Sequence, residues 1–225
     1  MIHYFADFST EFSGSLDSIG RFIGDGGVFM LCLVALSLLS VAVIVYKALT
    51  LRERNVVPEG AQEALGNAGE FVASGETEKL SGCLRDAPSA LSRVAGGVIA
   101  GDHGDRASAT TAAEADAREE VVELEKGIAL LEVVITIAPL LGLLGTVSGL
   151  VGVFTNLDPT GASGARAEVA RGIAEALYTT IAGLAVAVPT VIAHSYFTRK
   201  LERMGVRMEV LIGGLLAAQY RKRER

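Results

Sequence analysis

Residues Ile137–Phe154 read IAPLLGLLGTVSGLVGVF, an uncharged stretch with four glycines spaced three, four and three residues apart. On a helix this spacing places the glycines on one stripe, with Thr146 beside them. Each glycine costs a soluble helix about 1 kcal/mol relative to alanine, whereas in lipid a small-residue stripe lets another helix approach closely. The stretch therefore predicts a membrane helix packed against a neighbour. The glycines expected at such contacts are Gly142, Gly145, Gly149, Gly152 and Gly183.

Three uncharged windows are long enough to cross a bilayer: Val28–Tyr46, Val133–Leu157 and Ala176–Ala193. The chain is half hydrophobic and has a mean hydropathy of +0.42, which is more apolar than ordinary soluble domains. Buried core helices are the alternative interpretation of the windows. The first window does not look like a cleaved signal peptide, because acidic residues outnumber basic ones before it. The sequence predicts an all-α membrane protein with three transmembrane helices, the second and third extended far into the cytoplasm.

Basic residues are concentrated after the first and third windows and at the end of the chain. Lys47, Arg52 and Arg54 follow the first window, a larger group follows the third, and RKRER occupies 221–225. The positive-inside rule then places the N-terminus outside and both the 50–127 segment and the C-terminus inside. The group after the third window consists of Arg199, Lys200, Arg203 and Arg207.

Apolar periodicity and helix-breaking residues divide the chain into seven segments. Residues 1–24 form an amphipathic periplasmic-side helix, 25–49 transmembrane helix 1, and 50–110 a cytoplasmic helical segment. Residues 111–157 form one long helix that includes transmembrane helix 2, since Val121, Leu124, Ile128 and Leu131 keep one apolar face. A short periplasmic loop (158–170), a long helix that includes transmembrane helix 3 (171–220) and a basic tail (221–225) follow.

Helical rise places pairs of residues at matching depths in the second and third spans. Thr146 and Thr180 both fall about 6–7 Å to the outer side of the midplane, so their hydroxyls can face one interior. Bonding to their own helix is the simpler role of membrane threonines. Pro139 and Pro189 share a level on the cytoplasmic side and are hinge candidates, because each removes one helical hydrogen bond.

Three ionisable residues lie toward the ends of these spans. Glu175 lies about 15 Å toward the outside, and with Thr179 one turn on it predicts an acid that feeds a hydroxyl-lined path. Glu132 and His194 both fall roughly 14 Å toward the cytoplasm. These two could pair at the cytoplasmic exit of a path or serve as interfacial anchors.

The sequence contains none of the motifs that would indicate enzyme chemistry. GxxxxGK[ST] and HExxH are absent, and GTVSG at 145–149 is not GxSxG. Cys32 and Cys83 predict neither a disulfide framework nor a metal site. A net charge of -6 argues against a nucleic-acid partner. We expect no catalytic residue, no metal and no cofactor.

Two stretches resemble the MotA/TolQ/ExbB family of proton-channel subunits, and they are most similar to ExbB. They are GIALLEVVITIAPLLGLLGTVSGLVGVF (127–154) and ARGIAEALYTTIAGLAVAVPTVIAHSYFTRKLERM (170–204). The resemblance implies a homopentamer around the helices of a single-span ExbD- or TolR-like partner, acting on a TonB- or TolA-like protein. It also implies that Thr146 and Thr180 are lumen hydroxyls and that Glu175 is a conducting or gating acid. Ser148 and Tyr178 depart from the familiar pattern.

The resemblance therefore predicts a motor of the bacterial inner membrane that converts proton motive force into mechanical work. In this setting the N-terminus of the chain lies in the periplasm and its C-terminus in the cytoplasm. Two other classes stay open from the sequence, a passive membrane scaffold and a stand-alone ion channel. A scaffold would tolerate Thr146→Val and Glu175→Ala as long as the complex formed, and a stand-alone channel would conduct without a second subunit.

Overall fold

The computed structural model describes residues 27–101, 103–155 and 165–223, which are helical almost throughout. The predicted amphipathic helix at 1–24, most of the loop at 158–170 and the last two residues lie outside the described residues. The helices are α2 (Gly27–Thr50), α3 (Glu53–Val56), α4 (Glu59–Gly66), α5 (Ala68–Ser74), α6 (Thr77–Asp86), α7 (Ala90–Ala100), α8 (Arg106–Glu125), α9 (Ile128–Thr155) and α10 (Ala165–Arg223).

Three of these helices are long and apolar enough to cross a membrane, which confirms the predicted fold class. The spanning candidates are Val28–Thr50, Ile128–Thr155 and Val169–Arg221, with mean hydropathies of 3.0, 2.3 and 1.8 over their most apolar windows. The third extends beyond the membrane, because α10 continues through the basic group to Arg223.

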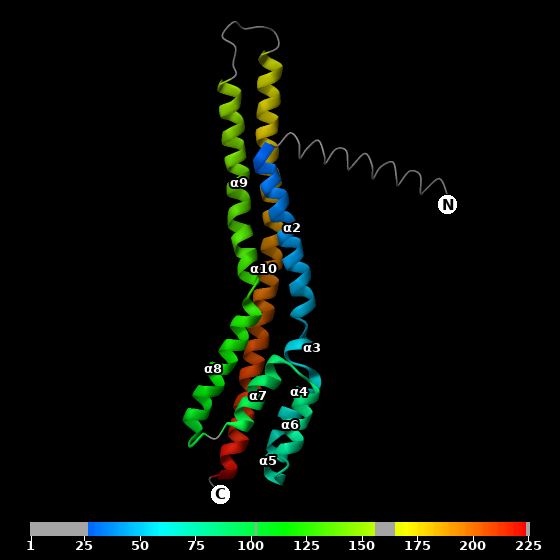
Figure 1. Ribbon diagram of the computed structural model, residues 1–225, viewed down its shortest axis with the longest axis vertical. Coiled ribbons are helices and arrows are strands. Elements are labelled where there is room, and N and C mark those ends of the chain that lie inside the picture. Colours follow the sequence, from blue (N-terminus) through cyan, green and yellow to red (C-terminus); the bar gives the residue numbers. More distant parts are fainter. Residues whose placement is uncertain (1–26, 102, 156–164, 224–225) are drawn as a thin grey trace, which may run out of the picture. The chain divides into compact units, whose positions relative to one another are not determined.

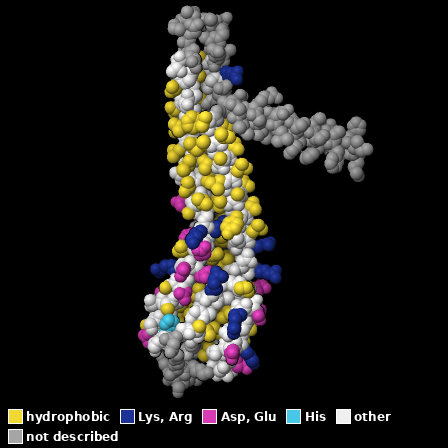
Figure 2. All heavy atoms as spheres, in the orientation of Figure 1, with side chains coloured by type: hydrophobic (Ala, Val, Ile, Leu, Met, Phe, Trp, Pro, Cys, Tyr) yellow, Lys and Arg dark blue, Asp and Glu magenta, His cyan; other side chains and the backbone are white. Residues whose placement is uncertain are grey.

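The chain divides into two units. The first, which we call the membrane unit, comprises Met1–Ile44 and Leu130–Ala193, and the second, the charged unit, comprises Val45–Ala129 and His194–Arg225. Hydrophobic side chains cover the described part of the membrane unit in Figure 2, whereas Lys, Arg, Asp and Glu side chains are concentrated on the charged unit.

In the membrane unit α2, α9 and α10 lie beside one another (Figure 1). Leu33 of α2 packs with Val134 and Ala138 of α9, and Ala182 and Val186 of α10 border this cluster. Most other large apolar side chains of the unit point outward, as a helix surrounded by lipid or by other subunits requires.

The charged unit has a core of its own, to which α3 to α8 and the second half of α10 contribute. Leu91, Leu80 and Met208 are among its fully buried side chains. Helix α7 begins at the cap residue Ser89, whose hydroxyl accepts a hydrogen bond from the Ser92 amide at 3.1 Å. Burial of this apolar surface explains why so polar a segment still folds.

Caps and an ion pair fix α8 within the charged unit. Asp105 caps its start by accepting hydrogen bonds from the hydroxyl and the amide of Ser108, and these bonds lower the pKa of the Asp105 carboxyl. Arg93 of α7 forms an ion pair with Glu120. The hydrogen bonds that Arg93 donates to this carboxylate raise the pKa of its guanidinium.

The single helix predicted over 111–157 is wrong at one point. Helix α8 ends at Glu125 and α9 begins at Ile128, so Lys126 and Gly127 form a break. Gly127 has φ +90°, a conformation that L side chains rarely adopt. The Lys47 ammonium donates a hydrogen bond to the Leu124 carbonyl at 2.9 Å and so caps the last turn of α8.

Replacing Gly127 by alanine should destabilise the protein, because a Cβ there has to adopt φ +90° and would lie 3.0 Å from Lys47 Cε. We expect a cost of about 1–2 kcal/mol, which lowers the thermal unfolding midpoint by roughly 2–8 °C. Circular dichroism of the detergent-solubilised protein measures the midpoint. Gly104→Ala is the control, because no described atom lies within 4 Å of the added Cβ. Equal midpoints for the two variants would contradict the assigned backbone conformation.

Candidate functional site

The contact between α9 and α10 is built on glycines whose missing side chains let the backbones touch. A Cβ added to Gly142 would lie 2.8 Å from the backbone oxygen of Thr179, and one added to Gly183 would lie 2.6 Å from the backbone oxygen of Ala138. Backbone atoms cannot move aside as a flexible side chain can. Neither glycine can therefore be replaced without moving the helices apart.

The other three glycines of the stripe differ in how close an added Cβ would come to its neighbours. A Cβ on Gly145 would lie 2.6 Å from the Thr179 hydroxyl oxygen, and one on Gly149 would lie 3.0 Å from the Cβ of Ala176. Gly152 has no described atom within 4 Å of such a Cβ. Among the described residues, the glycine stripe thus faces α10 along most of its predicted length but not at Gly152, toward the C-terminal end of α9.

Three threonine hydroxyls converge on two carbonyl groups at this contact. Thr146 Oγ1 lies 3.1 Å from the Gly142 carbonyl oxygen and 2.9 Å from that of Ala176 on the opposite helix. Thr179 Oγ1 lies 3.1 Å and 2.8 Å from the same two oxygens. Thr180 Oγ1 lies 3.2 Å from the Gly142 oxygen and is also hydrogen-bonded to the Thr146 hydroxyl. Thr146 and Thr180, which were predicted to lie at the same depth, are therefore in direct contact.

These hydroxyls have more acceptors within reach than protons to donate. Each threonine carries one hydroxyl proton, yet the three have five hydroxyl-to-carbonyl contacts and one contact with each other. Several donor arrangements therefore satisfy the same heavy-atom positions. A hydroxyl can turn from one acceptor to another without moving its helix.

Burial separates the three threonines into two kinds. Thr179 is 3 % exposed and its hydroxyl contacts a carbonyl of each helix, so it serves the contact between them, and its place along a path stays a prediction. Thr146 and Thr180 are half-buried and remain within reach of a group outside the α9–α10 pair. Apolar residues close to them in sequence are exposed, among them Leu143, Val147 and Leu184.

A second hydroxyl pair, which we did not predict from the sequence, joins α2 to α10. Ser40 and Thr190 are 3 % and 1 % exposed, and their hydroxyl oxygens lie 2.7 Å apart. Because Thr190 also donates to the Val186 carbonyl at 2.7 Å, Ser40 is the donor to Thr190. The position of Ser40 inside the apolar run of α2 could have indicated a polar contact, but only the fold identifies Thr190 as its partner.

The remaining predicted residues take less defined places. Pro139 and Pro189 lie inside α9 and α10. Glu175 belongs to α10, but its side chain lies outside the described residues. Glu132 is in the membrane unit and His194 begins the second stretch of the charged unit. Their pairing stays a prediction.

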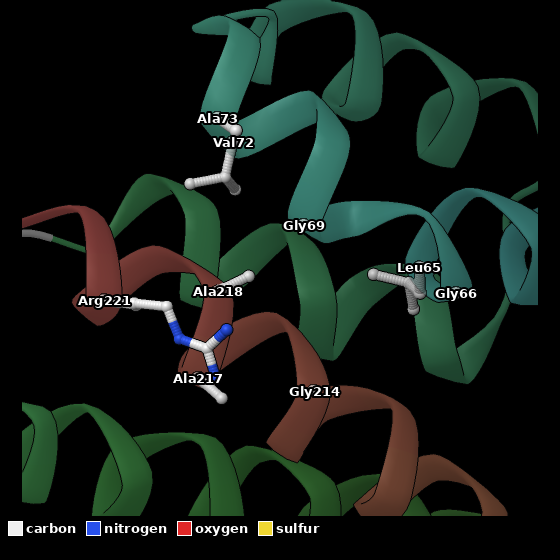
Figure 3. A pocket seen from close by; sticks show the side chains of 9 residues that line it. All are labelled: Leu65, Gly66, Gly69, Val72, Ala73, Gly214, Ala217, Ala218 and Arg221. Carbon is white, nitrogen blue, oxygen red and sulfur yellow. The ribbon is translucent and has the colours of Figure 1, made fainter.

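The charged unit contains a hollow of about 540 Å³, and glycines and alanines are among the residues that line it (Figure 3). Arg221, the first residue of the basic tail, lines it together with residues of α4, α5 and α10. In the part of the chain that the structure describes, no group of three or more His, Cys, Asp or Glu side chains is arranged to hold a metal ion. The other lining residues are Leu65, Gly66, Gly69, Val72, Ala73, Gly214, Ala217 and Ala218.

A family model for the MotA/TolQ/ExbB proton channel family matches residues 69–210. The matched segment runs from α5 to the second half of α10 and includes the threonine cluster and the whole of α9. It covers well over half of the chain.

Individual relatives match shorter segments. The chain is 51% identical over 80 residues to the biopolymer transport protein ExbB-like 1 of Synechocystis sp., which is 34% of this chain and 31% of that protein. It is 34% identical over 90 residues to the biopolymer transport protein ExbB of Helicobacter pylori (40% and 61%). It is 38% identical over 105 residues to the Tol-Pal system protein TolQ of Pseudomonas aeruginosa (47% and 45%). Each match spans less than two thirds of the relative.

Gly142→Ala should weaken the α9–α10 contact, because the new Cβ meets the Thr179 backbone at 2.8 Å. Overpacking of this kind costs about 1–3 kcal/mol, and unfolding by titration with sodium dodecyl sulfate in mixed micelles measures the loss. Gly152→Ala is the matched control on the same stripe and should be neutral or slightly stabilising, since no described atom lies within 4 Å of its Cβ. If both variants unfold at the same detergent fraction, the contact described above is incorrect.

Proposed function

The chain belongs to the MotA/TolQ/ExbB proton channel family, and we propose that it forms the wall of a proton path in an inner-membrane motor. In this proposal the chain is not an enzyme. It supplies the apolar, hydroxyl-bearing surface along which a partner's acid moves a proton, and proton motive force is converted into mechanical work.

The observation that carries the proposal is the threonine cluster in an otherwise uncharged region. Residues 133–155 and 176–193 contain no Asp, Glu, Lys, Arg or His. A bare charge in hydrocarbon is costly, so a proton needs an acidic carrier that these stretches do not supply. Thr146 and Thr180 are half-buried and have alternative acceptors. Their hydroxyls can donate to a carboxylate or accept from a protonated acid as the carrier changes state.

The carrier in this proposal is the membrane aspartate of a single-span ExbD- or TolR-like protein. A homopentamer of this chain around two such helices would present five equivalent copies of the threonine pair. Five walls and two helices do not share a symmetry, so successive protonation would favour rotation of one part inside the other. The exposed apolar side chains of α9 and α10 supply surface for contacts between copies and with the partner helices.

The basic residues set the direction of the proposed path. Lys47 ends the apolar run of α2, and Lys200 and Arg203 follow that of α10, which favours a cytoplasmic C-terminus and a periplasmic N-terminus. With this orientation Glu175 would lie near the periplasmic mouth as the conducting or gating acid. Glu132 and His194 would lie at the cytoplasmic end, and bends at Pro139 and Pro189 would share one level.

The mechanical output in this proposal is force on a TonB- or TolA-like protein that reaches across the periplasm. Relatives of both kinds support this class of output, since one is named a biopolymer transport protein ExbB and another a Tol-Pal system protein TolQ.

A passive scaffold is the second candidate, and one observation favours it. Every threonine hydroxyl of the cluster already reaches a backbone carbonyl, so the same contacts could serve only to hold α9 against α10. The two candidates differ in whether the hydroxyl is needed once the complex has formed.

Thr180→Val should reduce proton flux through the assembled complex, because valine keeps the volume but cannot donate to the partner acid. A hydrogen bond to a charged group is worth about 1.5–3 kcal/mol, so we expect a fall of roughly ten- to hundredfold. Proteoliposomes that hold the chain with its ExbD- or TolR-like partner and a pH-sensitive dye report the flux. Thr180→Ser keeps the hydroxyl and should retain most of it.

Thr136→Val is the matched control for this experiment. Thr136 is exposed on α9, and among the described residues its hydroxyl bonds only the Glu132 carbonyl, so its loss should leave flux unchanged. If Thr180→Val assembles normally and conducts as well as Thr136→Val, the scaffold is the better account.

A further inference from the structure

A small cleft in the charged unit lies beside the part of α10 that follows its apolar stretch. It has a volume of about 200 Å³, and residues of α3, α4 and the segment between them face residues of α10 across it. Val57 and Met204, 2 % and 4 % exposed, form an apolar floor. The polar lining residues are Glu53, Gln62, Lys200, Arg203 and Arg207.

Cations dominate the cleft and are not neutralised within it. Lys200, Arg203 and Arg207 face one carboxylate, that of Glu53, and none of the four forms an ion pair with another described residue. Arg203 donates its Nε proton to the Arg199 carbonyl at 3.2 Å, which leaves its terminal guanidinium nitrogens without a described acceptor. Three convergent cations with spare donors constitute a site for an anion with several oxygen acceptors.

The position of these cations along α10 indicates where the anion comes from. Tyr196 and Phe197 are packed edge to face just after the apolar stretch, which is where aromatic residues mark a membrane–water interface. Lys200 lies about 4.5 Å and Arg207 about 15 Å farther along the helix axis. Helical side chains lean toward the N-terminus of their helix, so all three lean toward the membrane end of α10.

We propose that this cleft binds the phosphate of an anionic phospholipid headgroup. Lys200, Arg203 and Arg207 hold the phosphate oxygens, while Val57 and Met204 contact the apolar part of the headgroup region. The volume is below the 300–1,000 Å³ typical of pockets for drug-sized ligands, so it suits a phosphate-sized group better than a nucleotide. Basic pockets beside membrane helices recognise lipid headgroups through the same chemistry.

This site goes beyond the proton path and does not depend on it. Its role is to fix the height of α10 relative to the bilayer, because a headgroup bound between α3 and α10 ties both to one leaflet. A soluble phosphate could use the same three cations, so the test has to separate the two sources.

Native mass spectrometry of the full chain in a non-ionic detergent measures bound lipid directly. Titration with dioleoylphosphatidylglycerol should give one tightly held lipid per chain. The first bound dioleoylphosphatidylcholine should have an affinity at least tenfold lower. The variant Lys200→Gln, Arg203→Gln, Arg207→Gln should lose this preference. The control Arg106→Gln, Arg118→Gln, Arg221→Gln removes three charges elsewhere in the charged unit and should keep it within twofold.

Three outcomes would overturn the proposal. One is equal affinity of the wild-type chain for the two lipids, and another is equal loss in both triple variants, which would reflect general charge attraction. The third is displacement of phosphatidylglycerol by millimolar inorganic phosphate, which would assign the cleft to a soluble phosphate. Retained binding in the control together with loss in the cleft variant supports the lipid site.

Discussion

The close approach of α9 and α10 depends on the absence of side chains at Gly142 and Gly183. That approach brings the Gly142 carbonyl within hydrogen-bonding distance of hydroxyls from both helices. Without it, Thr146 and Thr180 would each bond within their own helix and could not touch. The close helix packing thus creates the threonine cluster on which the proposed function depends. This packing requires glycines, although glycine lowers the stability of a helix.

Charge is distributed so that the middle of each span remains uncharged while charged residues lie toward its ends. The hydroxyl cluster is a polar feature that stays within reach of a partner in that middle region, and Ser40 and Thr190 are buried between α2 and α10. In the charged unit, Lys47 caps α8 at the break before α9, and the cations of α10 line the proposed headgroup cleft. The proposed proton path and lipid site therefore use separate residues.

Sequence periodicity predicted the features that depend on which face of a helix is apolar or small. The glycine stripe, the three spans and the matching depth of Thr146 and Thr180 are of this kind. The break at Gly127 was missed because the apolar stripe continues on both sides of it, and periodicity does not report a positive φ. The burial of Thr179 was not predicted, because it depends on the neighbouring helix. The pairs Ser40–Thr190 and Lys47–Leu124 join residues more than seventy positions apart, so no local pattern predicts them.

The most direct test of the central claim, that this chain surrounds a partner's helices, is the stoichiometry of the complex. Native mass spectrometry of the chain, expressed alone and with its ExbD- or TolR-like partner, measures this stoichiometry. The account predicts five copies of this chain with two of the partner. A monomer, or an oligomer whose composition is unchanged by the partner, would contradict it.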